Sequence, residues 1–127
     1  MLAEQSLGLD THLPSIDALQ NMLKYWNENY VSFSTVMEKN GYAWEAVKVK
    51  TGDGYTLTTF HVTGKVAEDG TIVTREPTEP PILVQHGLGN DAATWLWSYL
   101  RGVPLPLQLY DAGFDVWLGN NRGTEYS

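Results

Sequence analysis

In Pro81-Ile82-Leu83-Val84-Gln85-His86-Gly87-Leu88-Gly89, an apolar run of strand length ends abruptly in a His-Gly turn. Prolines bound the run on one side and glycines on the other, so we predict a buried β-strand over residues 82–85. A strand that breaks in this way before a helix leaves backbone N–H groups unpaired at the mouth of a sheet. Such groups can stabilise negative charge that develops on a substrate oxygen.

A second apolar strand ends in a glycine-rich loop at Asp111-Ala112-Gly113-Phe114-Asp115-Val116-Trp117-Leu118-Gly119-Asn120-Asn121-Arg122-Gly123. This strand is predicted over residues 114–118, and the segments 92–100 and 107–112 before it are predicted to be helical. Strand, helix and strand in this order are typical of a βαβ unit with parallel strands and a right-handed crossover. The loops after both strands should therefore lie at the carboxyl edge of the sheet, where open α/β sheets bind ligands.

The N-terminal residues predict a loose leader and one amphipathic helix. Ser15 or Asp17 is suited to cap a helix that ends near Asn29. Its apolar residues recur at spacings of three and four, which predicts a packing face made of Ile16, Leu19, Leu23 and Trp26. We therefore assign residues 1–40 to an N-terminal leader and helix, and residues 41–127 to an α/β domain.

A β-hairpin is predicted after the N-terminal helix and before the strand over residues 82–85. Val47 and Val49 alternate with lysines before the turn Thr51-Gly52-Asp53-Gly54, and apolar residues alternate again after it. Residues 64–81 are rich in Gly, Thr, Glu and Pro, which predicts an exposed loop with a short strand at residues 71–74. Together these patterns predict the α/β fold class.

The composition of the 127-residue chain fits a folded domain, with 43% hydrophobic and 12% aromatic residues. A net charge of −7 with only 8 Lys and Arg argues against a nucleic-acid partner and against docking on anionic membranes. The chain has no cysteine, and we predict neither a cofactor nor a metal. The sequence shows no signal peptide and no apolar run of transmembrane length, and its compartment stays open.

Chemistry is expected in the two loops that follow the strands. The Leu88 amide is the best candidate for an oxyanion donor, because Gly87 and Gly89 let the backbone approach a substrate closely. We interpret the neighbouring His86 as an imidazole bonded to backbone rather than as a catalytic base. Substrate contacts are predicted for His86, Gly87, Gly89, Trp95 and Asn120.

Other polar and aromatic residues have plainer interpretations. Arg122 fits a structural ion pair or a carbonyl contact better than a clamp on an acidic ligand. Asp115 lies inside the second strand and is expected to accept hydrogen bonds. Trp95 fits an acyl pocket, but core packing is the more economical interpretation. Ser98 and Ser127 have no base in a plausible position, so neither is predicted as a nucleophile.

Four motifs, in the same order, resemble those of the acid lipases of the α/β-hydrolase fold, the family of gastric lipase, lysosomal acid lipase and yeast steryl ester hydrolases. The matching segments are Gly41-Tyr42, Val49–Leu57, Gln85–Leu88 and Gly113–Gly123. The resemblance implies a partial α/β-hydrolase fold with an N-terminal helix, a hairpin and the first βαβ unit. It also assigns the Leu88 amide to the oxyanion hole and implies a triacylglycerol or steryl ester substrate for the complete enzyme.

The family places its nucleophilic serine in Gly-x-Ser-x-Gly, a motif that these 127 residues do not contain. In hydrolases of this fold, the acid and the base follow the nucleophile in the chain. We therefore expect residues 41–127 to be the N-terminal portion of a lipase domain, truncated before the nucleophile and inactive on its own.

An alternative hypothesis is a non-enzymatic interaction module, or half of a split hydrolase that pairs with a complementing C-terminal hydrolase chain. The family's sheet arrangement implies that the strand over residues 82–85 lacks a neighbour here, and an exposed apolar strand edge is a pairing site. A lipid carrier that uses the Trp-rich segment is a third hypothesis.

Overall fold

The computed structural model describes residues 15–29 and 32–127, and the chain divides into two compact units between residues 30 and 31. The predicted leader, residues 1–14, lies outside the described residues. The predicted boundary at residue 40 stays a prediction.

The first unit contains the predicted amphipathic helix, α1 (Ile16–Asn29). The Ser15 hydroxyl caps it by accepting a hydrogen bond from the Ala18 N–H at 3.2 Å, which confirms one of the two predicted caps. That the apolar residues of this helix form a packing face stays a prediction. Within the described residues, no helix has both the length and the apolar character that a membrane crossing requires.

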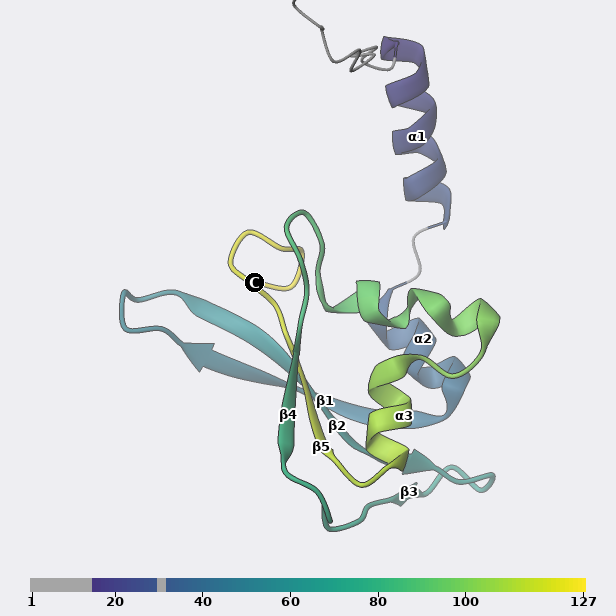
Figure 1. The fold of residues 1–127 in the computed structure, drawn as a ribbon, viewed down its shortest axis with the longest axis vertical. Helices are drawn as coiled ribbons and strands as arrows, with labels where there is room; N and C mark the ends of the chain where they lie inside the picture. The colour runs from purple at the N-terminus through teal and green to yellow at the C-terminus, as the bar shows by residue number, and fades with distance from the viewer. Residues whose placement is uncertain (1–14, 30–31) are drawn as a thin grey trace, which may run out of the picture. The chain divides into compact units, whose positions relative to one another are not determined.

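The second unit is a mixed β-sheet with helices packed on it (Figure 1). Its elements in chain order are α2 (Phe33–Asn40), β1 (Tyr42–Lys50), β2 (Thr56–Val66), β3 (Ile72–Val73), β4 (Pro81–Gln85), the 3₁₀ helix η1 (Ala92–Arg101), α3 (Leu105–Asp111) and β5 (Asp115–Gly119). The strand order is β1-β2-β5-β4, and β3 pairs with the end of β2. Strand β2 is antiparallel to β1 and to β5, whereas β4 and β5 are parallel. The predicted hairpin and the predicted parallel pair are confirmed.

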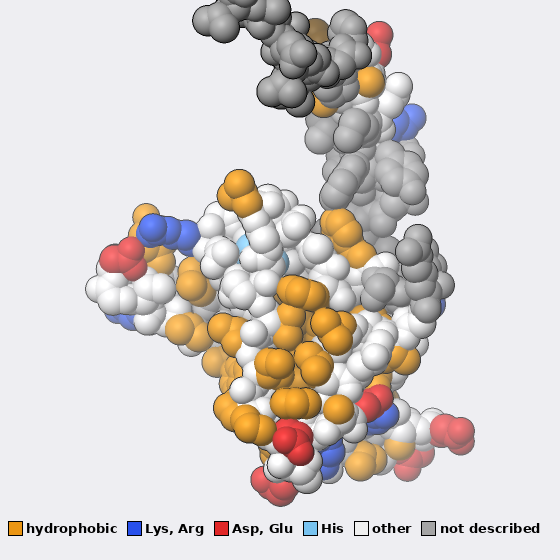
Figure 2. All heavy atoms as spheres, in the orientation of Figure 1, with side chains coloured by type: hydrophobic (Ala, Val, Ile, Leu, Met, Phe, Trp, Pro, Cys, Tyr) orange, Lys and Arg blue, Asp and Glu red, His pale blue; other side chains and the backbone are white. Residues whose placement is uncertain are grey.

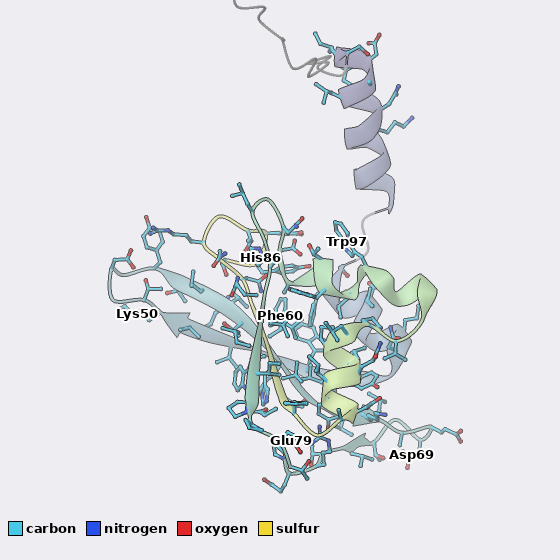
Figure 3. The ribbon with its side chains drawn as sticks, viewed as in Figure 1. Lys50, Phe60, Asp69, Glu79, His86 and Trp97 are labelled. Carbon is cyan, nitrogen blue, oxygen red and sulfur yellow. The ribbon has the colours of Figure 1, made fainter. Side chains whose placement is uncertain are left out.

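The hydrophobic core lies between one face of the sheet and the helices α2, η1 and α3. Because side chains alternate across a strand, β2 turns Phe60 and Val62 into the core, while His61 between them lies on the opposite face. Figure 3 shows Phe60 near the centre of the unit. Further buried members are Phe33, Val36, Met37, Leu96, Leu107, Val116 and Leu118. Burying one such side chain stabilises the fold by about 1.5–3 kcal/mol, so this core holds the sheet that carries the site.

Helix α2 was not predicted from the sequence, although both of its ends carry capping residues. The Ser32 hydroxyl accepts a hydrogen bond from the Thr35 N–H, and Gly41 ends the helix in the left-handed region at φ 71°. Phe33 lies 4.1 Å from the Phe60 ring, measured between centroids. The helix is only 8 residues long, so its tertiary packing rather than its own propensity decides that it forms.

Strand β4 corrects one prediction, because it is not a buried strand. Among its residues only Val84 is buried, and Leu83 is 61% exposed. The physical reason is position: β4 is the last strand in the order of the described sheet and has β5 as its neighbour on one side. Hydrophobic side chains gather over the region of β4 and α3 on the face shown in Figure 2. An apolar sequence predicted the strand, but its burial depends on neighbours that the pattern does not reveal.

Candidate functional site

A cavity of about 400 Å³ lies where the loops after β4 and β5 meet. It is lined by residues 86–91 of the first loop and residues 121–125 of the second. Both loops follow parallel strands, so the cavity stands at the carboxyl edge that was predicted to bind ligands. In Figure 3, His86 lies between the two loops. The structure thus brings together the predicted residues His86, Gly87, Leu88 and Gly89.

The loop after β4 turns sharply at Leu88. The Gly87 carbonyl accepts a hydrogen bond from the Asn90 N–H at 3.3 Å, and Gly89 has a φ of 75°. A positive φ at the third residue is the mark of a type II turn, which favours glycine there. Among the described residues, the Leu88 N–H makes no backbone hydrogen bond, and the Leu88 side chain is fully exposed. This amide is therefore available to an oxygen atom in the cavity.

The His86 imidazole joins the two loops through backbone groups. Its Nδ1 lies 2.8 Å from the Gly87 carbonyl oxygen, and its Nε2 lies 3.0 Å from the Asn121 backbone nitrogen. His86 is 9% exposed, and each of its ring nitrogens has one of these backbone partners. The predicted bonding of the His86 imidazole to backbone is confirmed, whereas its predicted contact with substrate stays a prediction.

Asn120 is buried beneath the cavity rather than among its lining residues. Its Oδ1 accepts a hydrogen bond from the Ala92 N–H and its Nδ2 donates to the Thr58 carbonyl, both at 2.9 Å. The side chain is 2% exposed, so these two bonds join the end of β5 to η1 and β2. A substrate contact by Asn120 stays a prediction, and this geometry favours a positioning role instead.

Trp95 is not among the residues that line the cavity. It packs against the hydrophobic core, as its more economical interpretation proposed. Its indole N–H is buried and has no hydrogen-bond partner among the described residues. A substrate contact by Trp95 stays a prediction that the position of the ring does not support.

Arg122 connects the cavity to the tip of the β1–β2 hairpin. Its Nη1 donates to the Asp53 carboxylate at 3.1 Å, and its guanidinium lies over the Tyr55 ring, 4.6 Å from the centroid. The predicted structural ion pair is confirmed. Both charged side chains are 61% exposed, so the pair contributes little stability but does bring the hairpin tip to the rim of the site.

A cluster on the open face of the sheet was missed by the sequence analysis. His61 Nδ1 lies 2.9 Å from the Glu45 carboxylate, its Nε2 lies 2.7 Å from the Asp115 carboxylate, and its ring stacks on Trp117. Asp115 also accepts a hydrogen bond from the Trp117 indole, so its predicted acceptor role is confirmed. Burial raises the pKa of the Asp115 carboxyl, but the hydrogen bonds from Trp117 and His61 outweigh it and lower the pKa overall. These partners come from β1, β2 and β5, so only the sheet register brings them together.

Residues 33–99 match the model of a protein family described as the partial α/β-hydrolase lipase region. The chain belongs to the α/β-hydrolase lipases. Within them, the acid lipases are its relatives: it is 38% identical to lipase member M of Mus musculus over 100 residues, 79% of this chain and 22% of that protein. It is 40% identical over 101 residues to a putative lysosomal acid lipase/cholesteryl ester hydrolase of Crotalus adamanteus, 79% of this chain and 24% of that protein.

A plant relative extends the same family. The chain is 42% identical over 91 residues to triacylglycerol lipase 2 of Arabidopsis thaliana, 68% of this chain and 20% of that protein. The chain spans less than a quarter of the length of these curated relatives. The resemblance that the four motifs indicated is confirmed at the level of the family.

Proposed function

We propose that this chain supplies the oxyanion-hole loop of a neutral-lipid ester hydrolase that acts on triacylglycerols or steryl esters. The observation that carries the proposal is the Leu88 N–H, which stands in a glycine turn beside the cavity and has no backbone partner among the described residues. The family of the chain and the names of its relatives supply the substrate class.

The proposed chemistry is acyl transfer to a serine followed by hydrolysis. As the ester carbonyl is attacked, its oxygen gains negative charge, and the Leu88 N–H donates a hydrogen bond to that oxygen. One such donor typically stabilises the transition state by about 2.7–4 kcal/mol. The serine, its base and its orienting acid belong to the full-length protein beyond the 127 residues, which contain no Gly-x-Ser-x-Gly.

The test is an assay of the full-length protein on emulsified triacylglycerol and on a steryl ester, with Leu88→Pro as the variant. Proline is favoured at the second position of a type II turn, so this change removes the N–H while the backbone keeps its course. We expect kcat to fall about 10²–10³-fold. Absence of activity on every lipid ester, or unchanged turnover in the variant, contradicts the proposal.

A second candidate function, pairing with another chain, is favoured by the position of β4. This strand ends the order of the described sheet, and Leu83 on it is 61% exposed. An apolar strand edge of this kind recruits another strand. If pairing is the function, the 127-residue chain should self-associate or bind a hydrolase chain in sedimentation experiments, and Leu83→Lys should abolish this. A chain that stays monomeric and binds no hydrolase partner rules this candidate out.

A further inference from the structure

We propose that His86, held as the neutral tautomer with its proton on Nδ1, sets the direction in which the Leu88 N–H points. This makes His86 a positioning residue for the oxyanion donor. The proposal rests on the proposed function for its catalytic meaning, but its geometric content belongs to the chain itself. It follows from three observations at the loop after β4.

The first observation fixes the tautomer of the ring. The Asn121 backbone N–H can only donate, so the His86 Nε2 at 3.0 Å must accept. The Gly87 carbonyl can only accept, so the Nδ1 at 2.8 Å must carry the proton. A neutral imidazole protonated on Nδ1 satisfies both partners, and the other tautomer satisfies neither.

The second observation concerns the peptide between Gly87 and Leu88. It is trans, and a trans peptide is planar, so its C=O and its N–H point in opposite directions. Because the His86 Nδ1–H holds the Gly87 carbonyl oxygen, the Leu88 N–H of the same peptide is turned away from the ring. In the Gly87–Asn90 turn, the same carbonyl oxygen also accepts a hydrogen bond from the Asn90 N–H. Two donors on one oxygen leave the peptide little freedom to rotate.

The third observation connects this peptide to the rest of the sheet. Asn121, which donates to His86, follows Asn120, whose side chain is locked to η1 and β2. His86 therefore transmits the position of the β5 loop to the Leu88 amide. Among the described residues, no other hydrogen bond joins Gly87 to the loop after β5.

The tautomer can be measured on the wild-type 127-residue chain, so no variant is needed for the first test. Long-range ¹H–¹⁵N NMR spectra distinguish a protonated ring nitrogen from an unprotonated one. We expect the His86 Nδ1 to be protonated and Nε2 to be unprotonated in the neutral ring. A neutral ring protonated on Nε2, or a mixture of both tautomers, overturns the proposal.

Two variants separate the two hydrogen bonds of the ring. In His86→Asn, the short amide can still donate to the Gly87 carbonyl from the place of Nδ1. In His86→Gln, the longer amide can still accept from the Asn121 N–H at the place of Nε2 but leaves the Gly87 carbonyl. We expect the Leu88 amide resonance to move less in His86→Asn, which keeps the bond to Gly87, than in His86→Gln, which loses it. His61→Gln, on the open face of the sheet, is the control and should leave that resonance in place.

In the full-length protein, the two His86 variants should differ in kcat. We expect His86→Gln to lower kcat about 10–100-fold with KM little changed, and His86→Asn, which loses only the bond to Asn121, to lower kcat less. Equal losses in both variants, or none in either, overturn the positioning role. If the full-length protein hydrolyses no ester, the proposed function fails, while the spectra of the 127-residue chain still decide whether His86 orients the Leu88 amide.

Discussion

His61 and His86, the two histidines among the described residues, have different kinds of hydrogen-bond partners. His86 at the carboxyl edge is bonded at both ring nitrogens to backbone groups of neighbouring loops. His61 on the open face of the sheet has a carboxylate at each nitrogen, from Glu45 and Asp115. Backbone partners require one neutral tautomer, whereas a ring between two carboxylates can keep both contacts when it is charged. The cavity edge is thus held by hydrogen bonds to backbone groups and the sheet face by hydrogen bonds to carboxylates, so side-chain truncation and pH should act on them differently.

The largest effect on the free energy of unfolding is expected from Asn120→Ala, which removes the uncharged hydrogen bonds beneath the cavity. The buried Ala92 N–H and Thr58 carbonyl lose their partners, and each unpaired group costs about 1–3 kcal/mol. The free energy of unfolding from urea titration measures the loss. Asn121→Ala is the matched control, because that exposed side chain should change stability by less than about 0.5 kcal/mol. Equal effects of the two changes would show that the Asn120 amide does not join the strands.

A smaller, pH-dependent effect on the free energy of unfolding is expected from Asp115→Asn, in the His61 cluster on the open face of the sheet. The folded pKa of Asp115 is lowered, so its stabilising effect is fully present above its ordinary value of 3.8 and is lost as the pH falls through the lower folded pKa. We expect the variant to lose about 1–2 kcal/mol of unfolding free energy near neutral pH and to converge on the wild type in acid. Urea titrations across the acid range check this, with the exposed Glu68→Gln as control. A gap between variant and wild type that does not narrow in acid would contradict the stabilising role of the ionised Asp115 carboxylate.

The smallest effect is expected at the rim, from Arg122→Ala. Its pair with Asp53 is exposed, so its removal should cost less than about 1 kcal/mol and the coupling between the two residues should shrink as salt is added. A double-mutant cycle with Asp53→Asn measures that coupling at low and high salt. A coupling energy that is large and insensitive to salt would contradict the account of this pair as an exposed surface ion pair.

Much of the fold follows from patterns that are local in the sequence. The strand–helix–strand order predicted the parallel pair β4 and β5 and placed the loops after both strands at one edge of the sheet. The turn at residues 51–54 predicted the hairpin. Helix α2 was missed although Ser32 and Gly41 mark its ends, because a short helix is stabilised by packing that the sequence does not show.

The features that sequence reasoning missed or misjudged depend on strand neighbours. The burial of β4 was predicted from its apolar residues, yet exposure of Leu83 follows from its place in the strand order. The contacts of His61 depend on the register between β1, β2 and β5, since its partners Glu45 and Asp115 are far apart in the chain. At Asn120, the sequence predicted a residue near the site, but only the structure shows its amide facing into the scaffold.

The most direct measurement compares kcat for Leu88→Pro and Leu88→Ala in the full-length protein on one lipid ester. Both changes remove the exposed leucine side chain, but only proline removes the backbone N–H. If this N–H stabilises the oxyanion, the proline variant should turn over about 10²–10³-fold more slowly than the alanine variant. Equal turnover by the two variants would contradict the role of the Leu88 amide.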